Sequence, residues 1–186
     1  DYNYWRQLGN VGWSWEDVLP YFKKSEDNQE GEDNFHGVGG PLKVEKMRAS
    51  FKVLDLFMEA AEEFGYHKTS DFNTGNNEGI GYFPLNVKNG FRCSSAVGYL
   101  NPIKKRKNLK ILTNAHIKNI EFENRKATNV SFWKNNQLLN VKTNKEIILS
   151  AGTIGSPHIL QASGIGPGAL LKKNNINIVK DTFIFN

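Results

Sequence analysis

The sequence predicts a chain of mixed α/β (α+β) class, with helices and strands sharing its first part and short strands dominating its second. Apolar side chains recur at helical spacing over residues 51–64, and short strand-like runs separated by Asn-rich turns begin at residue 109. A Gly-rich stretch within 145–167 joins an apolar run to a helical one. A period near 3.6 indicates an amphipathic helix, and alternation indicates a half-buried strand. With 186 residues and 39% hydrophobic composition, the chain has enough apolar material for a core.

The N-terminal region predicts a capped helix, a loop and a strand. Ser14 is a suitable N-cap, because its hydroxyl can accept a first-turn amide and acidic residues follow it. Pro20 falls in the early turns of this helix and is expected to kink it. Residues 28–40 are rich in Asn, Glu and Gly, which predicts a surface loop, and the alternating residues 41–46 predict a strand.

Residues 51–64 form the clearest amphipathic pattern, and Gly65 is expected to end that helix. We expect its apolar stripe to lie in the core: Phe51, Leu54, Phe57, Met58, Ala61 and Phe64. A further helix is expected to begin near Ser94 or Ser95. The composition then changes near Asn108 to the rhythm of a β-meander, so we place a boundary between residues 1–108 and 109–186.

The stretch SAGTIGSPHILQASGIGP, residues 150–167, predicts a strand–turn–helix unit after the apolar run KEIILS. Ser156 suits the N-cap and Pro157 the first helical position, where no N–H is needed. Gly152 and Gly155 allow a tight turn before the helix, and Gly164 is expected to end it. The free amides of the first helical turn would favour an anion such as a phosphate.

The pattern GIGPGA, residues 164–169, also fits a loose dinucleotide-binding motif and leaves an NAD(P)-binding enzyme as an alternative. That motif needs a strand before it and a full crossover helix after it. Here a helix precedes it and the following segment is short, so this alternative is disfavoured.

Composition excludes several other classes of site. A single cysteine, Cys93, rules out an internal disulfide and a multi-thiolate zinc site, and the four histidines share no metal-ligand spacing or evident acid–base partner. We therefore expect no metal site and no catalytic histidine among them. The net charge of +5 includes the basic run 104–107, which lacks interleaved aromatic residues, so we expect no nucleic acid partner. The sequence has no run of eighteen apolar residues that would predict a membrane span, and no N-terminal leader is visible. The localisation is therefore left open, and secretion of a longer protein is one of the alternatives.

Six stretches together resemble consecutive blocks of the glucose–methanol–choline (GMC) oxidoreductases, most closely the glucose dehydrogenase branch found in animals. The resemblance extends from about Tyr4 to Lys180, and residues 152–166 are similar, position for position, to the second motif of that family. The six stretches are YWRQLGNVGWSWEDVLPYFKKSEDN, FHGVGGPLKV, AAEEFGY, FRCSSAVGYLNPIKKRKNLKIL, TNAHIKNIEF and NKEIILSAGTIGSPHILQASGIGP.

This resemblance implies an FAD-dependent oxidoreductase that acts on the CH–OH group of an alcohol or sugar and transfers a hydride to flavin N5. It does not identify the electron acceptor that reoxidises the flavin. It also implies that residues 109–186 are the β-meander and strand–turn–helix of an FAD-binding α/β domain, and that residues 1–108 belong partly to an antiparallel-sheet substrate domain. Members of the family carry a pyrophosphate-binding Gly motif upstream of such a region and a catalytic His downstream of it, beyond Asn186. We therefore expect a central fragment, inactive by itself; the alternative is a non-catalytic truncated member acting as a binding or inert protein.

The resemblance also assigns candidate cofactor-binding residues and no catalytic residue within this chain. Ile117 occupies the strand position whose backbone is similar to the one that holds the adenine in family members. Ala151 and Gly152 end the strand that faces the cofactor, and Thr153 continues the turn. We expect all four residues to lie close to FAD.

Overall fold

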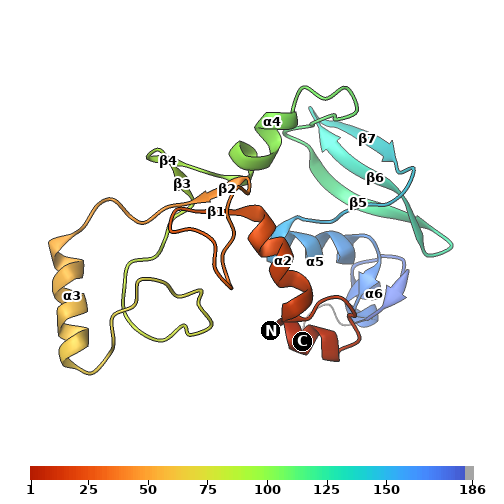
Figure 1. The fold of residues 1–186 in the computed structure, drawn as a ribbon. Helices are drawn as coiled ribbons and strands as arrows, with labels where there is room; N and C mark the ends of the chain where they lie inside the picture. The colour runs from red at the N-terminus through yellow and green to blue at the C-terminus, as the bar shows by residue number, and fades with distance from the viewer. Residues whose placement is uncertain (183–186) are drawn as a thin grey trace. The chain divides into compact units, whose positions relative to one another are not determined.

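The computed structural model describes residues 1–182 and divides into two compact units, a first unit of residues 1–109 and a second unit of residues 110–186. The division falls one residue from the composition change at Asn108. Both units mix helices and strands, in agreement with the predicted α/β class (Figure 1). Among residues 1–182, no helix is both long enough and apolar enough to cross a membrane.

The first unit opens with α1 (Tyr2–Gln7) and α2 (Trp15–Ser25). The predicted N-cap is confirmed: the Ser14 hydroxyl accepts the amide of Asp17, and the Asp17 carboxylate accepts the amide of Ser14 in return. This reciprocal pairing satisfies two donors that a helix start leaves open. Pro20 lies inside the helix, as expected.

Two short strand pairs follow α2 in the first unit. Strands β1 (Glu26–Asn28) and β2 (Leu42–Val44) pair in parallel, so the connection between them, residues 29–41, crosses from one end of the pair to the other. Strands β3 (Val87–Lys88) and β4 (Phe91–Arg92) form an antiparallel hairpin. Its two-residue turn, Asn89–Gly90, has positive φ angles of 53° and 83°, as such hairpin turns require.

Helix α3 (Lys52–Glu63) forms where the periodicity predicts it, and Gly65 follows its end with φ 102°. The prediction that its apolar stripe is core is wrong for the described residues, because no residue of α3 is buried and Phe57 is 64% exposed. Met47, Leu54, Phe57, Met58 and Phe83 instead help to line an open apolar groove of about 520 Å³. Helical periodicity marks which face is apolar, but burial also needs another element to cover that face.

The predicted helix near Ser95 is present as a five-residue π-helix, η1 (Ala96–Leu100), followed by α4 (Asn101–Ile103). A side chain at Gly98 would come within 2.6 Å of the carbonyl oxygen of Pro41, so only glycine allows this approach to β2. Cys93 is buried and its thiol lies 3.6 Å from the same carbonyl, which agrees with a packing role.

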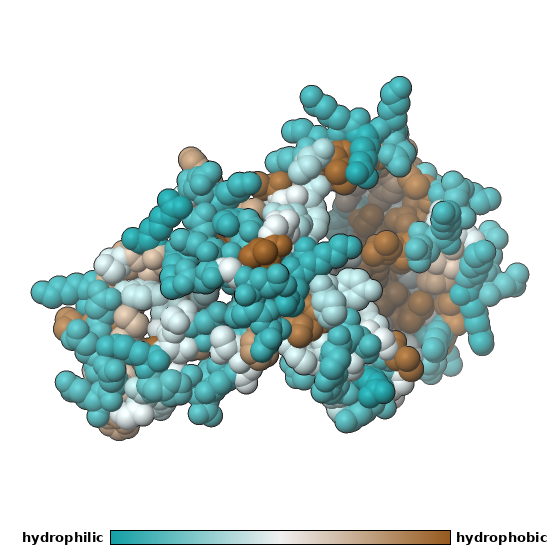
Figure 2. Space-filling model, in the orientation of Figure 1, coloured by the Kyte–Doolittle hydropathy of each residue, from teal (hydrophilic) through white to brown (hydrophobic). Residues whose placement is uncertain are grey.

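The second unit contains the predicted β-meander: β5 (His116–Glu123), β6 (Lys126–Lys134) and β7 (Gln137–Lys142), paired antiparallel in that order (Figure 1). Each connecting turn consists of two residues with positive φ, Asn124–Arg125 and Asn135–Asn136. Asparagine tolerates this conformation better than most residues, so the Asn-rich turns set the register locally. Hydrophobic side chains lie at the surface over this sheet (Figure 2). Leu138, Leu139 and Val141 of β7 are among the exposed apolar residues.

The predicted strand at residues 145–150 is absent from the structure. The segment is not paired with any other strand of the described residues, and Ile148 is 82% exposed. A strand exists only through a ladder with a neighbour, so an apolar run without one stays irregular.

Helix α5 (Gly152–Ala162) begins five residues before the predicted start at Pro157, so Ser156 is not its N-cap and Pro157 lies inside it. Ser156 still accepts the backbone amide of Ala151, at 3.0 Å, from within the helix. Gly164 follows the helix end with φ 89°, as predicted. The chain then forms β8 (Ile165–Gly166), α6 (Gly168–Lys173) and β9 (Lys180–Asp181), with β8 and β9 paired in parallel.

Candidate functional site

The N-terminal turn of α5 carries three of the four sequence-predicted cofactor residues, Ala151, Gly152 and Thr153. All three are exposed. Gly152 has φ 82°, and within the described residues 1–182 no neighbouring atom lies within 4 Å of the position that a side chain would take there. The turn is therefore open to solvent. Its shape depends on a left-handed backbone conformation at Gly152, which glycine adopts more easily than other residues.

The first-turn amides of α5 are available as donors. The first four N–H groups of a helix have no partner inside it, and the Ser156 hydroxyl accepts the amide of Ala151, which precedes the helix. The first turn contains no acidic residue that would repel an anion. The positive end of the helix dipole lies at the same place, so this turn has the donors and the electrostatics that a phosphate requires.

The opposite end of α5 is fixed to β5 by a buried serine. The Ser163 hydroxyl accepts the amide of Ile120 at 2.7 Å and donates to the carbonyl of Ile159 at 2.6 Å. Both Ser163 and Ile120 are buried. This contact sets the direction of α5 relative to β5.

Ile117, the fourth predicted cofactor residue, lies half-buried on β5, the strand against which α5 packs. It pairs with Phe132 of β6, and the register shifts immediately after it, between Ile117 and Asn119. β5 is an edge strand of the three-stranded sheet, so some of its backbone groups are not used by the ladder. The structure thus places all four candidate residues on two elements that pack together.

A polar cluster joins two strands of the meander. The Glu121 carboxylate accepts the hydroxyl of Ser131 and, at 3.0 Å, the side-chain amide of Asn129. These hydrogen bonds, that from Ser131 above all, hold the pKa of Glu121 below its ordinary value. They join β5 to β6 and give the charged carboxylate of Glu121 hydrogen-bond partners within the sheet.

The α5 turn offers two kinds of contact to an anionic organic cofactor. The turn supplies backbone donors for an anion, while Ile148 and Ile154, both more than 80% exposed, supply apolar surface on either side of it. Among residues 1–182 no group of three or more His, Cys, Asp or Glu side chains could hold a metal ion. The backbone donors and the exposed apolar side chains of the turn suit an anionic organic ligand.

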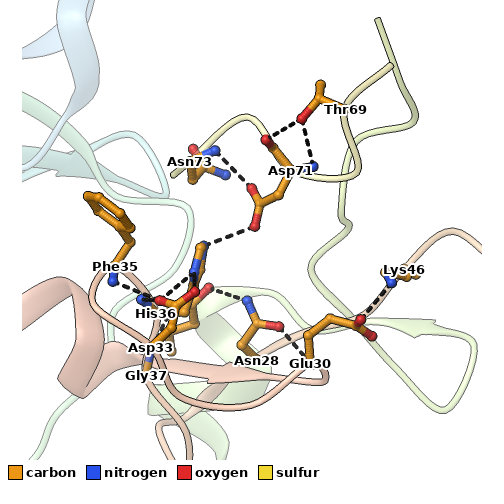
Figure 3. A network of polar contacts seen from close by, with 11 residues as sticks. Asn28, Glu30, Asp33, Phe35, His36, Gly37, Lys46, Thr69, Asp71 and Asn73 are labelled. Carbon is orange, nitrogen blue, oxygen red and sulfur yellow. Dashed lines mark hydrogen bonds and ion pairs between the residues drawn. The ribbon is translucent and has the colours of Figure 1, made fainter. Parts of the chain in front are cut away.

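The expectation that the four histidines lack acid–base partners is wrong for His36. This buried residue lies between the carboxylates of Asp33 and Asp71 (Figure 3). The spacing from Asp33, three residues earlier, was a usable local signal, whereas Asp71 is 35 residues away in sequence and becomes a neighbour only through the fold. His67, His116 and His158 are exposed.

Comparison with known proteins gives the context of this site. A family profile described as GMC oxidoreductase matches residues 1–177. The chain belongs to the GMC oxidoreductase family. Its curated relatives include oxygen-dependent choline dehydrogenases of Brucella ovis, 36% identical over 181 residues, and of Rhizobium meliloti, 38% identical over 181 residues. These alignments cover 97% of this chain and 33% of the relatives, so the chain spans about a third of their length.

Solved structures agree with this family and fold. Pyridoxine 4-oxidase from Mesorbium loti superimposes with a TM-score of 0.87 at 29% identity, and an FAD-dependent oxidoreductase from Chaetomium thermophilum with a TM-score of 0.86 at 31% identity. Both alignments cover 97% of this chain, and 36% and 34% of those chains. A fungal aryl-alcohol oxidase, at 24% identity and a TM-score of 0.84, shares the fold. FAD is the cofactor that this family membership implies.

Proposed function

We propose that this chain is the part of an FAD-dependent GMC oxidoreductase that holds one side of the flavin cofactor, and that the whole protein oxidises the CH–OH group of a small alcohol or sugar. The observation that carries the proposal is the exposed, donor-rich turn at the start of α5, in a chain that matches the family over residues 1–177. When bound, FAD supplies the acceptor for the hydride that leaves the alcohol carbon.

We assign the binding roles to four residues of this chain. The turn of Ala151, Gly152 and Thr153 orients the cofactor through backbone donors, and its openness at Gly152 lets a ligand approach the backbone closely. Ile117 contributes backbone groups of the edge strand β5 to the adenine end. None of these four residues removes the proton of the alcohol, and we assign that step to a base elsewhere in the protein.

The substrate is proposed at the level of a small alcohol. Relatives of this chain are named for choline, pyridoxine and aryl alcohols. Each named compound carries a CH–OH group, which is the shared chemistry. The nearer relationship to animal glucose dehydrogenases, and with it a sugar substrate, remains part of the proposal.

The test is to purify the full-length protein that contains these 186 residues and to measure its flavin content and its alcohol-dependent reduction of an artificial acceptor dye. Choline, pyridoxine, an aryl alcohol and glucose are the substrates to compare. We expect about one FAD per chain and reduction by at least one of the four. A flavin-free protein, or one whose flavin no alcohol reduces, would contradict the proposal.

For the 186 residues by themselves we propose weak flavin binding and no turnover, since an oriented cofactor and a positioned base are both needed for the reaction. The alternative of a non-catalytic family member is tested in the same assay. Stoichiometric flavin with alcohol-dependent dye reduction by the isolated chain would refute the proposed inactivity. A full-length protein lacking both would favour the non-catalytic alternative.

A further inference from the structure

The imidazole of His36 lies between two loops of the first unit and faces a carboxylate from each (Figure 3). Nδ1 lies 3.0 and 3.1 Å from the two carboxylate oxygens of Asp33, which belongs to the same β1–β2 connection. Nε2 lies 3.2 Å from Oδ2 of Asp71, in the loop that follows α3. Only 7% of the His36 side chain is exposed. A single side chain therefore joins the two loops.

Each carboxylate is fixed by its own loop. Asp33 Oδ1 accepts the backbone amides of Phe35 and His36, each at 2.7 Å. Asp71 Oδ1 accepts the amide of Asn73 at 2.8 Å, and the Thr69 hydroxyl accepts the Asp71 amide and donates to its carbonyl. These turns hold both carboxylates in place, so the imidazole meets acceptors on both sides.

Two acceptors require two protons on the ring. A neutral imidazole has one N–H donor and one acceptor nitrogen, whereas the imidazolium donates from both nitrogens. With a neutral ring, one nitrogen lone pair would face a carboxylate at about hydrogen-bond distance. The arrangement of His36, Asp33 and Asp71 is therefore complementary to the charged ring.

The charged groups around His36 favour the same state. Besides Asp33 and Asp71, the Glu26 carboxylate of β1 lies nearby and accepts the Gly37 amide at 3.0 Å. Lys23 of α2 donates to the Asp33 carbonyl at 2.6 Å and is the neighbouring cation. Burial opposes the charged ring, but the Asp33 hydrogen bond and the charges of the three carboxylates outweigh it and raise the pKa of His36. The same imidazole contact, with the Phe35 and His36 amides, lowers the pKa of Asp33 to about 2.

Few other contacts fasten the loop of residues 69–76 to the β1–β2 connection. Gly75 has φ 86° and lies against the Phe35 ring, where a side chain would come within 3.3 Å of the ring carbon Cζ. No other hydrogen bond or ion pair between residues 29–41 and 69–76 is found in the part of the chain that the structure describes. The ion pair of His36 and Asp71 is thus the main polar link between the two loops.

We propose that protonated His36 is a clamp that fastens the loop of residues 69–76 to the β1–β2 connection, and that the loop is released when the ring loses its proton. Because the pKa of His36 is higher in the folded protein than its ordinary value, the clamp is fully formed below that ordinary value. It is lost as the pH rises through the folded-state pKa. The clamp does not depend on flavin binding.

The experiment compares the wild-type protein with the variants His36→Gln and Asp71→Asn, and with His116→Gln as a control that removes an exposed histidine. Amide hydrogen exchange of residues 69–76 is measured at about pH 5.5 and about pH 9, on either side of the ordinary histidine pKa, with correction for intrinsic exchange rates. The pKa of His36 is followed by NMR in the wild-type and Asp71→Asn proteins.

In the wild-type protein we expect protection of residues 69–76 to fall at least about tenfold from the lower to the higher pH, as for loss of a hydrogen bond to a charged group. His36→Gln and Asp71→Asn should lose that protection already at the lower pH, while His116→Gln behaves as wild type. The pKa of His36 should fall in Asp71→Asn. Equal protection at both pH values, or a His36 pKa that is unchanged in Asp71→Asn, would overturn the proposal.

Discussion

The two ends of α5 differ in the surroundings that the second unit gives them. At the C-terminal end, Ser163 and Gly164 are buried, and the Gly164 carbonyl accepts the amides of Val179 at 2.8 Å and Lys180 at 3.1 Å. At the N-terminal end, Ala151 and Gly152 are exposed, and among residues 1–182 no neighbouring atom lies within 4 Å of the position of a side chain at Gly152. The buried end fixes where the helix points, and the exposed end leaves backbone donors free for a ligand. We therefore expect substitutions at the C-terminal end of α5 to change stability, and substitutions at its N-terminal end to change ligand binding.

The largest expected effect is that of Gly164→Ala. Gly164 has φ 89°, and an added side chain would lie 2.3 Å from the carbonyl oxygen of Asn177. The left-handed conformation and the clash together should lower the free energy of unfolding by about 3 kcal/mol. Urea denaturation measures the loss in the free energy of unfolding. Hydrogen exchange of the β5 amides is a second measure of the same loss.

Gly152→Ala is the matched control, because Gly152 has a similar φ of 82° but nothing within 4 Å of the added side chain. Here only the conformational cost remains, about 1 kcal/mol. Equal destabilisation by the two substitutions would show that the buried and exposed ends do not differ as described.

A smaller effect is expected for Ser163→Ala. The substitution removes the acceptor of the Ile120 amide and leaves that buried N–H without a partner. An unsatisfied buried donor costs about 1 to 3 kcal/mol. Faster exchange of the Ile120 amide, measured by NMR, should accompany the loss of stability.

The smallest effect is expected for Ser156→Ala, the serine at the other end of α5. Its hydroxyl accepts the amide of Ala151, but that amide is exposed and can bond to water instead. We expect a change of about 0.5 kcal/mol in the free energy of unfolding. A loss as large as that of Ser163→Ala would mean that the exposed end is also structurally essential.

Local signals made parts of this fold predictable from the sequence. The cap at Ser14 lies within the segment it organises, and so do the turns at Asn124–Arg125 and Asn135–Asn136. Non-local requirements account for the errors. The apolar run 145–150 is unpaired and α3 is uncovered among the described residues, and neither a pairing partner nor a covering surface can be read from the segment itself.

The candidate sites show the same division. The structure confirms left-handed conformations at Gly152 in the turn before α5 and at Gly164 after its end. Gly155, also predicted to lie in the turn, lies inside the helix instead. Residue preferences placed the N-cap at Ser156, whereas the N-cap is Ala151 and its amide donates to the Ser156 hydroxyl. The partner of His36 across the loops, Asp71, depends on the tertiary fold and had no local signal.

The most direct test of the central claim is the flavin affinity of the full-length protein carrying Thr153→Glu, with His158→Glu as the control. Both side chains are exposed on α5, and an acidic residue in the first helical turn stabilises the helix, so loss of folding is not expected. A negative charge at the donor-rich turn should repel an anionic cofactor and weaken FAD binding at least about tenfold, the equivalent of about 1.4 kcal/mol, while His158→Glu retains it. Unchanged FAD affinity in Thr153→Glu would contradict the assignment of this turn to the cofactor.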